Sequence, residues 1–382
     1  MKRSISFLII ICILPLLCGC GGMRKQYRRL EQMLVVQTLG LDEDENGHRL
    51  TLSSASSNSQ KAACLSGSGR TISSALERIR NYSFEEDIFC AHVSHVLIGE
   101  EAAKAGIEDI LSYICHSPEL RIDLPLYIIK GGTAEETISS IGGESKGITE
   151  LIDSIRSAME HRGDGNVFTA AEILGNTERN GSALVCAIEY APSSEKAPEE
   201  GAEELKTAAV YGYAVLKGNK LVKYIDNKDA VAVGFLLGKP GICEIDLKDH
   251  DGHTVTLEID SGSAELQPVW DEQGYLKGID VKAKASASVL ETTGHGSDFD
   301  NAEYANYLVA QLEKELSTRI GNVLKLSKTL RADFLDLAGK LEFCEPQHYR
   351  AAVGELSELL PKLELRVSVR GKLSHTNDLK DA

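Results

Sequence analysis

The chain has 382 residues, of which 42% are hydrophobic and 26% are charged, a composition typical of folded globular proteins. The formal net charge of −16 disfavours binding to nucleic acid, which depends on neutralising phosphates, and disfavours a body that lies flat on an anionic membrane. About 360 residues remain beyond the first twenty, too many for one compact core, so the length predicts two or three domains.

The first twenty residues predict export and a lipid anchor. Lys2 and Arg3 precede an apolar run over residues 7–17, and Leu17-Cys18-Gly19-Cys20 follows. This order is typical of a secretory signal peptide, and a run of about 11 apolar residues is too short to span a membrane. Gly19 before Cys20 resembles a bacterial lipobox, so we expect residues 1–19 to be removed and Cys20 to carry diacylglycerol. The alternative is an ordinary cleaved signal with incidental cysteines.

A lipid on Cys20 would hold the protein at the outer face of the cytoplasmic membrane, because two acyl chains anchor firmly where one anchors only marginally. Residues 20–33 would then form a stem. Four basic residues lie in this stem: Arg24, Lys25, Arg28 and Arg29. They could each add about 1 kcal/mol of attraction to an anionic surface, or simply keep the stem solvated.

Residues 34–190 are predicted to form an N-terminal domain of mixed helices and strands. Short apolar and β-branched runs predict strands at residues 34–41, 49–53, 93–99, 124–130 and 183–190, and Asn46-Gly47 is a hairpin turn signal between the first two. Helical spacing of apolar residues predicts helices at 73–80, 101–115 and 148–161. The small polar stretch 54–69 and the glycine-rich stretch 142–147 are predicted loops.

Residues 191–206 are expected to be an acidic linker. They contain two prolines and five glutamates with few apolar residues, a composition that predicts a solvated connection. Beyond them we expect a small β-rich middle domain at 207–260 and a C-terminal α+β domain at 261–376.

The second half begins with hairpins and continues with a long helix. Gly218-Asn219 and Asp251-Gly252 are hairpin turn signals, and residues 276–290 carry further strand pattern. A helix is predicted over residues 301–328, with Asp300 or Asn301 as its cap, then a shorter helix at 346–359 and an alternating strand at 363–369. The apolar stripe of the long helix is Tyr304, Leu308, Leu312, Leu316, Ile320 and Val323. The order predicts an α+β fold with mixed or antiparallel sheets covered by helices.

No familiar catalytic motif occurs: the phosphate-binding loop, G-x-S-x-G and H-E-x-x-H are all absent from the sequence. The glycine-rich stretch 66–69 is better explained as a flexible loop than as a phosphate site. His92 and His95 are expected on opposite faces of a strand, where they could not share a metal. We therefore predict no catalytic residue, no metal and no cofactor.

Two further polar features favour structural roles. The group His250, Asp251 and His253 resembles a ligand cluster, but it falls on a hairpin turn where Asp-Gly is favoured for backbone reasons. Asp333 lies in an apolar helical context and is expected to be a hydrogen-bonded structural aspartate.

Six cysteines follow Cys20: Cys64, Cys90, Cys115, Cys186, Cys243 and Cys344. An even number in an exported protein permits disulfides, but the irregular spacing and the domain size do not require them. Cys90 and Cys115 are predicted to be small buried apolar residues.

Several segments occur in an order that resembles one known family. They are the lipobox, residues 35–42 with the ending Leu39-Gly40-Leu41-Asp42, and residues 71–76, 95–107, 117–121, 127–134, 214–222, 332–339, 344–346 and the final alternating strand. In this order they resemble the Ger(x)C type of spore germination lipoprotein, the C subunit of nutrient germinant receptors.

The resemblance implies a three-domain α+β lipoprotein on the outer face of the spore inner membrane, in a family with no known enzymatic activity. It implies two partners: an A subunit, which is a membrane protein with a cytoplasmic domain, and a B subunit, which resembles an amino-acid transporter. A tethered protein meets such neighbours at high effective concentration.

Two other functions remain open. An extracytoplasmic solute-binding lipoprotein of a transporter would have two lobes of repeated βαβ units around a cleft. An envelope hydrolase would need a nucleophile and a base, or a metal site, in one pocket.

Overall fold

The computed structural model describes residues 33–45, 47–54, 63–83, 87–141, 147–162, 165–192, 206–293, 301–352 and 356–374. The strands are β1 Met33–Asp44, β2 Gly47–Ser54, β3 Cys64–Gly69, β4 Asp87–Phe89, β5 His95–Ile98, β6 Pro125–Lys130, β7 Phe168–Thr169, β8 Ser182–Pro192, β9 Lys206–Lys217, β10 Lys220–Asp226, β11 Cys243–Lys248, β12 Thr254–Trp270, β13 Leu276–Thr292 and β14 Glu364–Leu373.

The described helices alternate with these strands. They are α2 Ile72–Tyr82, α3 Glu100–Ala105, α4 Glu108–His116, α5 Ala134–Ile141, α6 Ile148–Arg162, α7 Ala170–Asn180, α8 Asn227–Leu237, α9 Ala302–Leu330, α10 Leu337–Cys344, α11 Pro346–Ala352, α12 Leu356–Leu359 and a 3₁₀ turn at Leu360–Lys362.

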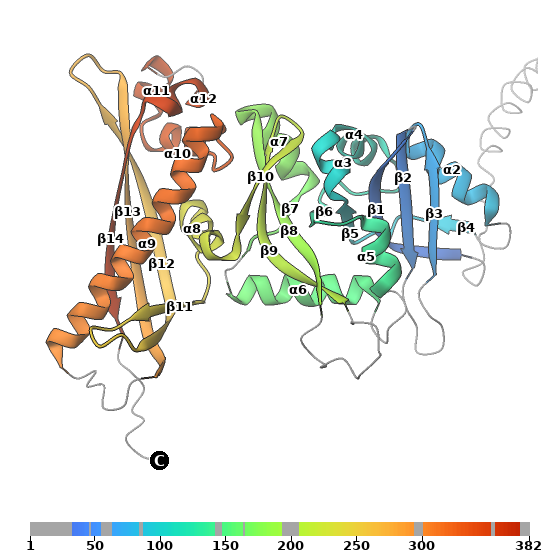
Figure 1. Cartoon of the computed structure of the whole chain (residues 1–382). Coiled ribbons are helices and arrows are strands. Elements are labelled where there is room, and N and C mark those ends of the chain that lie inside the picture. Colours follow the sequence, from blue (N-terminus) through green and yellow to red (C-terminus); the bar gives the residue numbers. More distant parts are fainter. Residues whose placement is uncertain are drawn as a thin grey trace, which may run out of the picture.

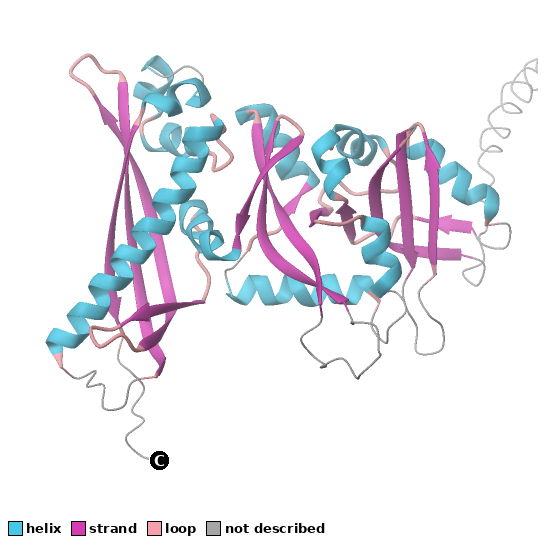
Figure 2. Ribbon diagram, viewed as in Figure 1, coloured by secondary structure: helices cyan, strands magenta, loops and turns pink. Residues whose placement is uncertain are grey.

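The strands form two sheets that follow one another along an elongated molecule (Figure 1). The first has ten strands in the order β10-β9-β8-β6-β5-β1-β2-β3, with β4 on β1 and β7 on β6. The second has four strands in the order β11-β12-β13-β14. Helices and strands mix in both parts (Figure 2), so the predicted α+β class with mixed sheets is confirmed.

The centre of the first sheet is parallel and buried on both faces. β1, β5, β6 and β8 pair in parallel, while the outer strands pair antiparallel. Leu97 and Tyr127 lie in a core with residues of α5 and α6, whereas Val96 and Leu126, one position away, lie in the main core with residues of α3, α4 and α7. Alternation of period two therefore supplies apolar side chains to both layers of helices.

The second sheet is covered on one face by the long helix α9. Asn301 caps this helix by accepting the N–H groups of Glu303 and Tyr304, and its predicted stripe is buried. The predicted hairpins β9–β10 and β11–β12 are present, and β14 joins β13 in parallel. Residues that point away from α9 on β14 are exposed, as expected for a strand with one solvated face.

Three local predictions are wrong. The helix expected at 101–115 is divided into α3 and α4 at Gly106, whose φ of +137° turns the chain so that the N–H of Ile107 donates to Asn219 O. The end of the predicted loop 54–69 is strand β3, paired with β2. Cys115 is exposed, whereas Cys90 is buried as expected.

The sheets do not follow the domain division expected from the sequence. Pro192 at the end of β8 pairs with Lys206 at the start of β9, so residues 191–206 connect neighbouring strands of one sheet. Of the strands expected in a middle domain, β9 and β10 belong to the first sheet, and β11 with the start of β12 belongs to the second. Residues 193–205 and 142–146 lie outside the described residues.

Cutting the chain within residues 193–205 should leave both fragments associated. The pairing of β8 with β9 extends from Ser182↔Lys217 to Pro192↔Lys206, and a nick between the two strands breaks none of it. A protease site inserted there and cut in the soluble body should give fragments that co-elute in gel filtration and part only in denaturant. Separation in native buffer would contradict the single sheet.

Replacing Leu312 with Ala should lower the free energy of unfolding by about 2–5 kcal/mol, because the substitution empties space in a closed core. Leu312 is fully buried in α9, whereas Leu290 on β13 is 46% exposed. Leu290→Ala is therefore the control and should change stability by less than about 0.5 kcal/mol. Unchanged stability of Leu312→Ala, together with lost association with partner proteins, would identify the stripe as an interface.

Candidate functional site

The carboxyl ends of the central strands meet at one edge of the first sheet, where open α/β sheets commonly bind ligands. Asp42 at this edge is 4% exposed, and its carboxylate accepts the N–H groups of Ala134 at 2.7 Å and Glu135 at 2.8 Å. Asp42 therefore caps the start of α5. Burial raises the pKa of the Asp42 carboxyl, against the effect of these two backbone donors. Gly99 makes room for it, because a Cβ there would lie 2.0 Å from Asp42 Oδ1.

Glu100 occupies the neighbouring strand end. Its carboxylate accepts the N–H of Gly131 and the hydroxyl of Tyr224 at 3.2 Å, and it pairs with Lys104 at 2.6 Å. Desolvation raises the pKa of the Glu100 carboxyl, but the hydrogen bonds from Lys104 and Gly131 lower it by more. The pKa of Glu100 therefore lies below its usual value. Asp42 and Glu100 thus form their hydrogen bonds with other groups of the protein at this edge.

The two histidines of the β5 region do not share a strand as predicted, because His92 lies in a turn and His95 begins β5. His92 is exposed, whereas His95 is 1% exposed and its Nε2 lies 2.9 Å from Asp153 Oδ1. Burial lowers the pKa of His95, against the opposing effect of Asp153. Since Asp153 belongs to α6, the contact attaches this helix to the sheet.

The β11–β12 turn contains the one group of the described residues with the spacing of metal ligands, and it differs from the predicted one. Asp249, Asp251 and His253 have ligand atoms within 4.8 Å of one another, while the ring of His250 lies against Tyr304 instead. Asp249 accepts the N–H groups of Asp251 and His253 and the hydroxyl of Tyr304 at 3.2 Å. These bonds close the turn and attach the start of α9, so turn geometry accounts for the cluster.

Asp333 is the structural aspartate that the sequence predicts. It is 2% exposed and accepts the N–H groups of Leu337 and Ala338, both at 2.8 Å, at the start of α10. Burial raises the pKa of Asp333 to about 6, against the effect of those two donors. Nearby Asp336 accepts the side-chain amide of Asn180 at 2.9 Å, which links α10 to the end of α7.

The ionisation of Asp333 should make the protein less stable as the pH rises from 4.5 to 7. The folded-state pKa of about 6 lies above the ordinary 3.8, so the folded chain holds this proton more tightly and loses that advantage as the pH passes 6. Between these pH values the loss should be about 2 kcal/mol of unfolding free energy. Asp333→Asn should remove this component, measured as the difference between urea titrations of variant and wild type. An identical pH profile in both proteins would contradict it.

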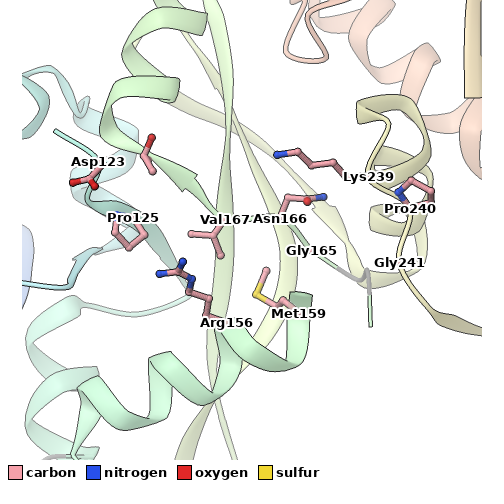
Figure 3. A pocket seen from close by; sticks show the side chains of 11 residues that line it. Asp123, Pro125, Arg156, Met159, Gly165, Asn166, Val167, Lys239, Pro240 and Gly241 are labelled. Atoms are coloured by element: carbon pink, nitrogen blue, oxygen red, sulfur yellow. The ribbon is translucent and has the colours of Figure 1, made fainter. Parts of the chain in front are cut away.

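Two cavities lie beside the chain segment that joins the sheets. One of about 360 Å³ is bordered by Arg156 and Met159 of α6 on one side and by residues 239–241 on the other (Figure 3). Its charged lining is Asp123, Arg156 and Lys239, above the buried side chain of Met159. The second, of about 630 Å³, lies among α8, α9 and β11.

The remaining predicted positions divide into two groups. Cys20 lies outside the described residues. The glycine-rich stretch 66–69 lies within β3, where Gly67 and Gly69 face α2: a Cβ on Gly67 would lie 2.6 Å from Ile79, and one on Gly69 would lie 2.4 Å from Ser74. Sequence reasoning missed Asp42 and Glu100, and the signal that could have found Asp42 is its place directly after an apolar strand.

Comparisons with known proteins give consistent results. Residues 26–190 match the family model described as the spore germination protein N-terminal domain, and residues 211–377 match the one described as spore germination B3/GerAC like, C-terminal. The crystal structure of the GerBC protein has a similar fold, with a TM-score of 0.56 and 16% sequence identity over 88% of this chain and 97% of that one. A comparison with curated protein sequences finds no match.

Proposed function

The chain belongs to the Ger(x)C family of spore germination proteins, the C subunits of germinant receptors, and from this we propose that it is a membrane-anchored lipoprotein that triggers germination by associating with the other receptor subunits. The observation that carries the proposal is the ordered match of the N- and C-terminal family models to residues 26–190 and 211–377. The two matches leave only short stretches of the chain uncovered, so the assignment concerns the whole body.

The anchor in this proposal is a diacylglycerol on Cys20. The support is the basic start, the apolar run at 7–17 and Gly19 before Cys20. No helix among the described residues is long and apolar enough to cross a membrane. The protein would sit on the outer face of the spore inner membrane, joined to it by residues 20–33.

Replacing Cys20 with Ala should release the protein from membranes and impair germination without changing the stability of the body, because only the acyl anchor is lost. Cys18→Ala is the matched control and should leave the protein membrane-bound. Mass spectrometry of the wild-type mature amino terminus should show a diacylglycerol cysteine at position 20. An unmodified residue 20, or lipid on Cys18, would refute the assignment.

Association with other proteins is the proposed mode of action. The strand ends at which α/β proteins commonly bind ligands are occupied here by Asp42 and Glu100. The partners implied by the family are the A and B membrane subunits of the receptor. Co-purification of the full-length lipoprotein with these subunits from detergent extracts tests the proposal, and their failure to co-purify would count against it.

The solute-binding alternative receives no support from the described architecture. Such proteins have two lobes of repeated βαβ units, whereas the second sheet here consists of antiparallel hairpins plus one parallel strand beneath a single long helix.

A further inference from the structure

The outer edge of β3 differs from the other three strands that end the two sheets. The edge strands β10, β11 and β14 carry three, three and four charged residues, a common protection against unwanted strand pairing. The register of β10 is also interrupted by a bulge. β3 contains only Cys64, Leu65, two serines and two glycines, and its pairing with β2 has no interruption.

The pairing pattern fixes which backbone groups of β3 point outward. The N–H of Ser54 donates to Ala63 O at 3.0 Å, so Ser54 and Ala63 form a hydrogen-bonded pair. The backbone N–H and C=O groups alternate in direction along the antiparallel register. Those of residues 65, 67 and 69 therefore point toward β2, and those of residues 64, 66 and 68 point away from it. Within the described part of the chain, no backbone hydrogen bond joins residues 64–69 to any segment other than β2.

Packing against α2 explains the small residues on only one of the two faces of β3. Gly67 and Gly69 face α2, where a Cβ would collide with the helix. Cys64, Ser66 and Ser68 face the opposite side, where the nearest helix is α5. Cys64 and Ser66 are exposed there, so α5 does not cover them. The missing charges on that face leave a six-residue template for another strand.

The edge lies at the anchored end of the molecule. β3 is separated from β1 only by β2, which places it about 10 Å from the strand that continues from the stem. Thirteen residue steps from Cys20 to Met33 reach at most about 45 Å, so an anchor at Cys20 would keep this edge close to the membrane and to proteins embedded in it. In Figure 1, β3 and β4 lie at the end of the first sheet that is away from the second sheet.

We infer that β3 is the site at which an extended segment of another receptor subunit adds to the first sheet. This inference rests on the proposed function. The segment would pair with the outward N–H and C=O groups of Cys64, Ser66 and Ser68. Its side chains would alternate, with apolar ones on the side of Leu65 and α2 and polar ones on the open side of Ser66.

Proline at position 66 tests the pairing directly. Ser66→Pro removes one outward N–H and leaves the ladder to β2 intact, because that ladder uses residues 65, 67 and 69. Ser66→Ala is the matched control, since it removes the hydroxyl that contacts Thr51 Oγ1 at 3.2 Å but keeps the N–H. In full-length lipoprotein purified with the other receptor subunits, Ser66→Pro should weaken association about tenfold or more, and Ser66→Ala should not.

Hydrogen exchange of the wild-type protein provides a test that needs no variant. The amides of residues 64, 66 and 68 should exchange quickly in the isolated chain and slowly in the receptor, while those of 65, 67 and 69 should exchange slowly in both. Unchanged exchange on assembly, or normal association of a folded Ser66→Pro variant, would overturn the inference.

Other occupants give distinct results that also overturn it. Slow exchange of the three outward amides in the dilute isolated chain would assign the edge to a segment of the same molecule. Protection that grows with chain concentration, without other subunits, would assign it to a second copy. If the wild-type chain does not associate with the other subunits at all, the proposed function itself fails. Association that is insensitive to Ser66→Pro defeats only the site.

Discussion

The two sheets share one core because α8 is buried between them. Its residues 230–236 are all buried, which is expected of a helix that is apolar on every side. The ring of Phe235 lies where a side chain on Gly262 of β12 would be, since a Cβ there would be 2.4 Å from the ring. Arg319 of α9 donates to Lys228 O at 3.0 Å at the start of the same helix. The relative position of the sheets, and hence both cavities beside the joining segment, depends on this helix.

The first sheet resembles a ligand-binding α/β sheet in its central topology. It differs in what lies at the carboxyl ends of its central strands. In such folds the N–H groups at a helix start commonly hold an anionic ligand. Here the carboxylate of Asp42 takes that position at the start of α5, and Gly99 provides the space for it. Interactions within the chain thus use the donors that a ligand would need. The start of α5 is therefore not available to such a ligand.

Local patterns predicted most of the regular structure, and long-range contacts account for the errors. The stripe of α9 and the turns at Gly218-Asn219 and Asp251-Gly252 are local signals, and their elements are present. Strand β3 has no such signal, because contact with α2 and pairing with β2 place its serines and glycines in a sheet. Asp333 was predicted correctly from its apolar context, whereas the turn carboxylate that does most of the bonding is Asp249, outside the predicted group.

The closed hairpin between β8 and β9 makes the acidic segment a tolerant site for insertions. Pro192 and Lys206 are cross-strand partners, so the two ends of the segment are held together by the sheet whatever its length. Doubling the length of a flexible closed loop costs only about 0.6 kcal/mol in conformational entropy. A fluorescent or affinity module carried at this position would therefore add little strain to the sheet, and length differences among related chains at this point are compatible with one unchanged fold.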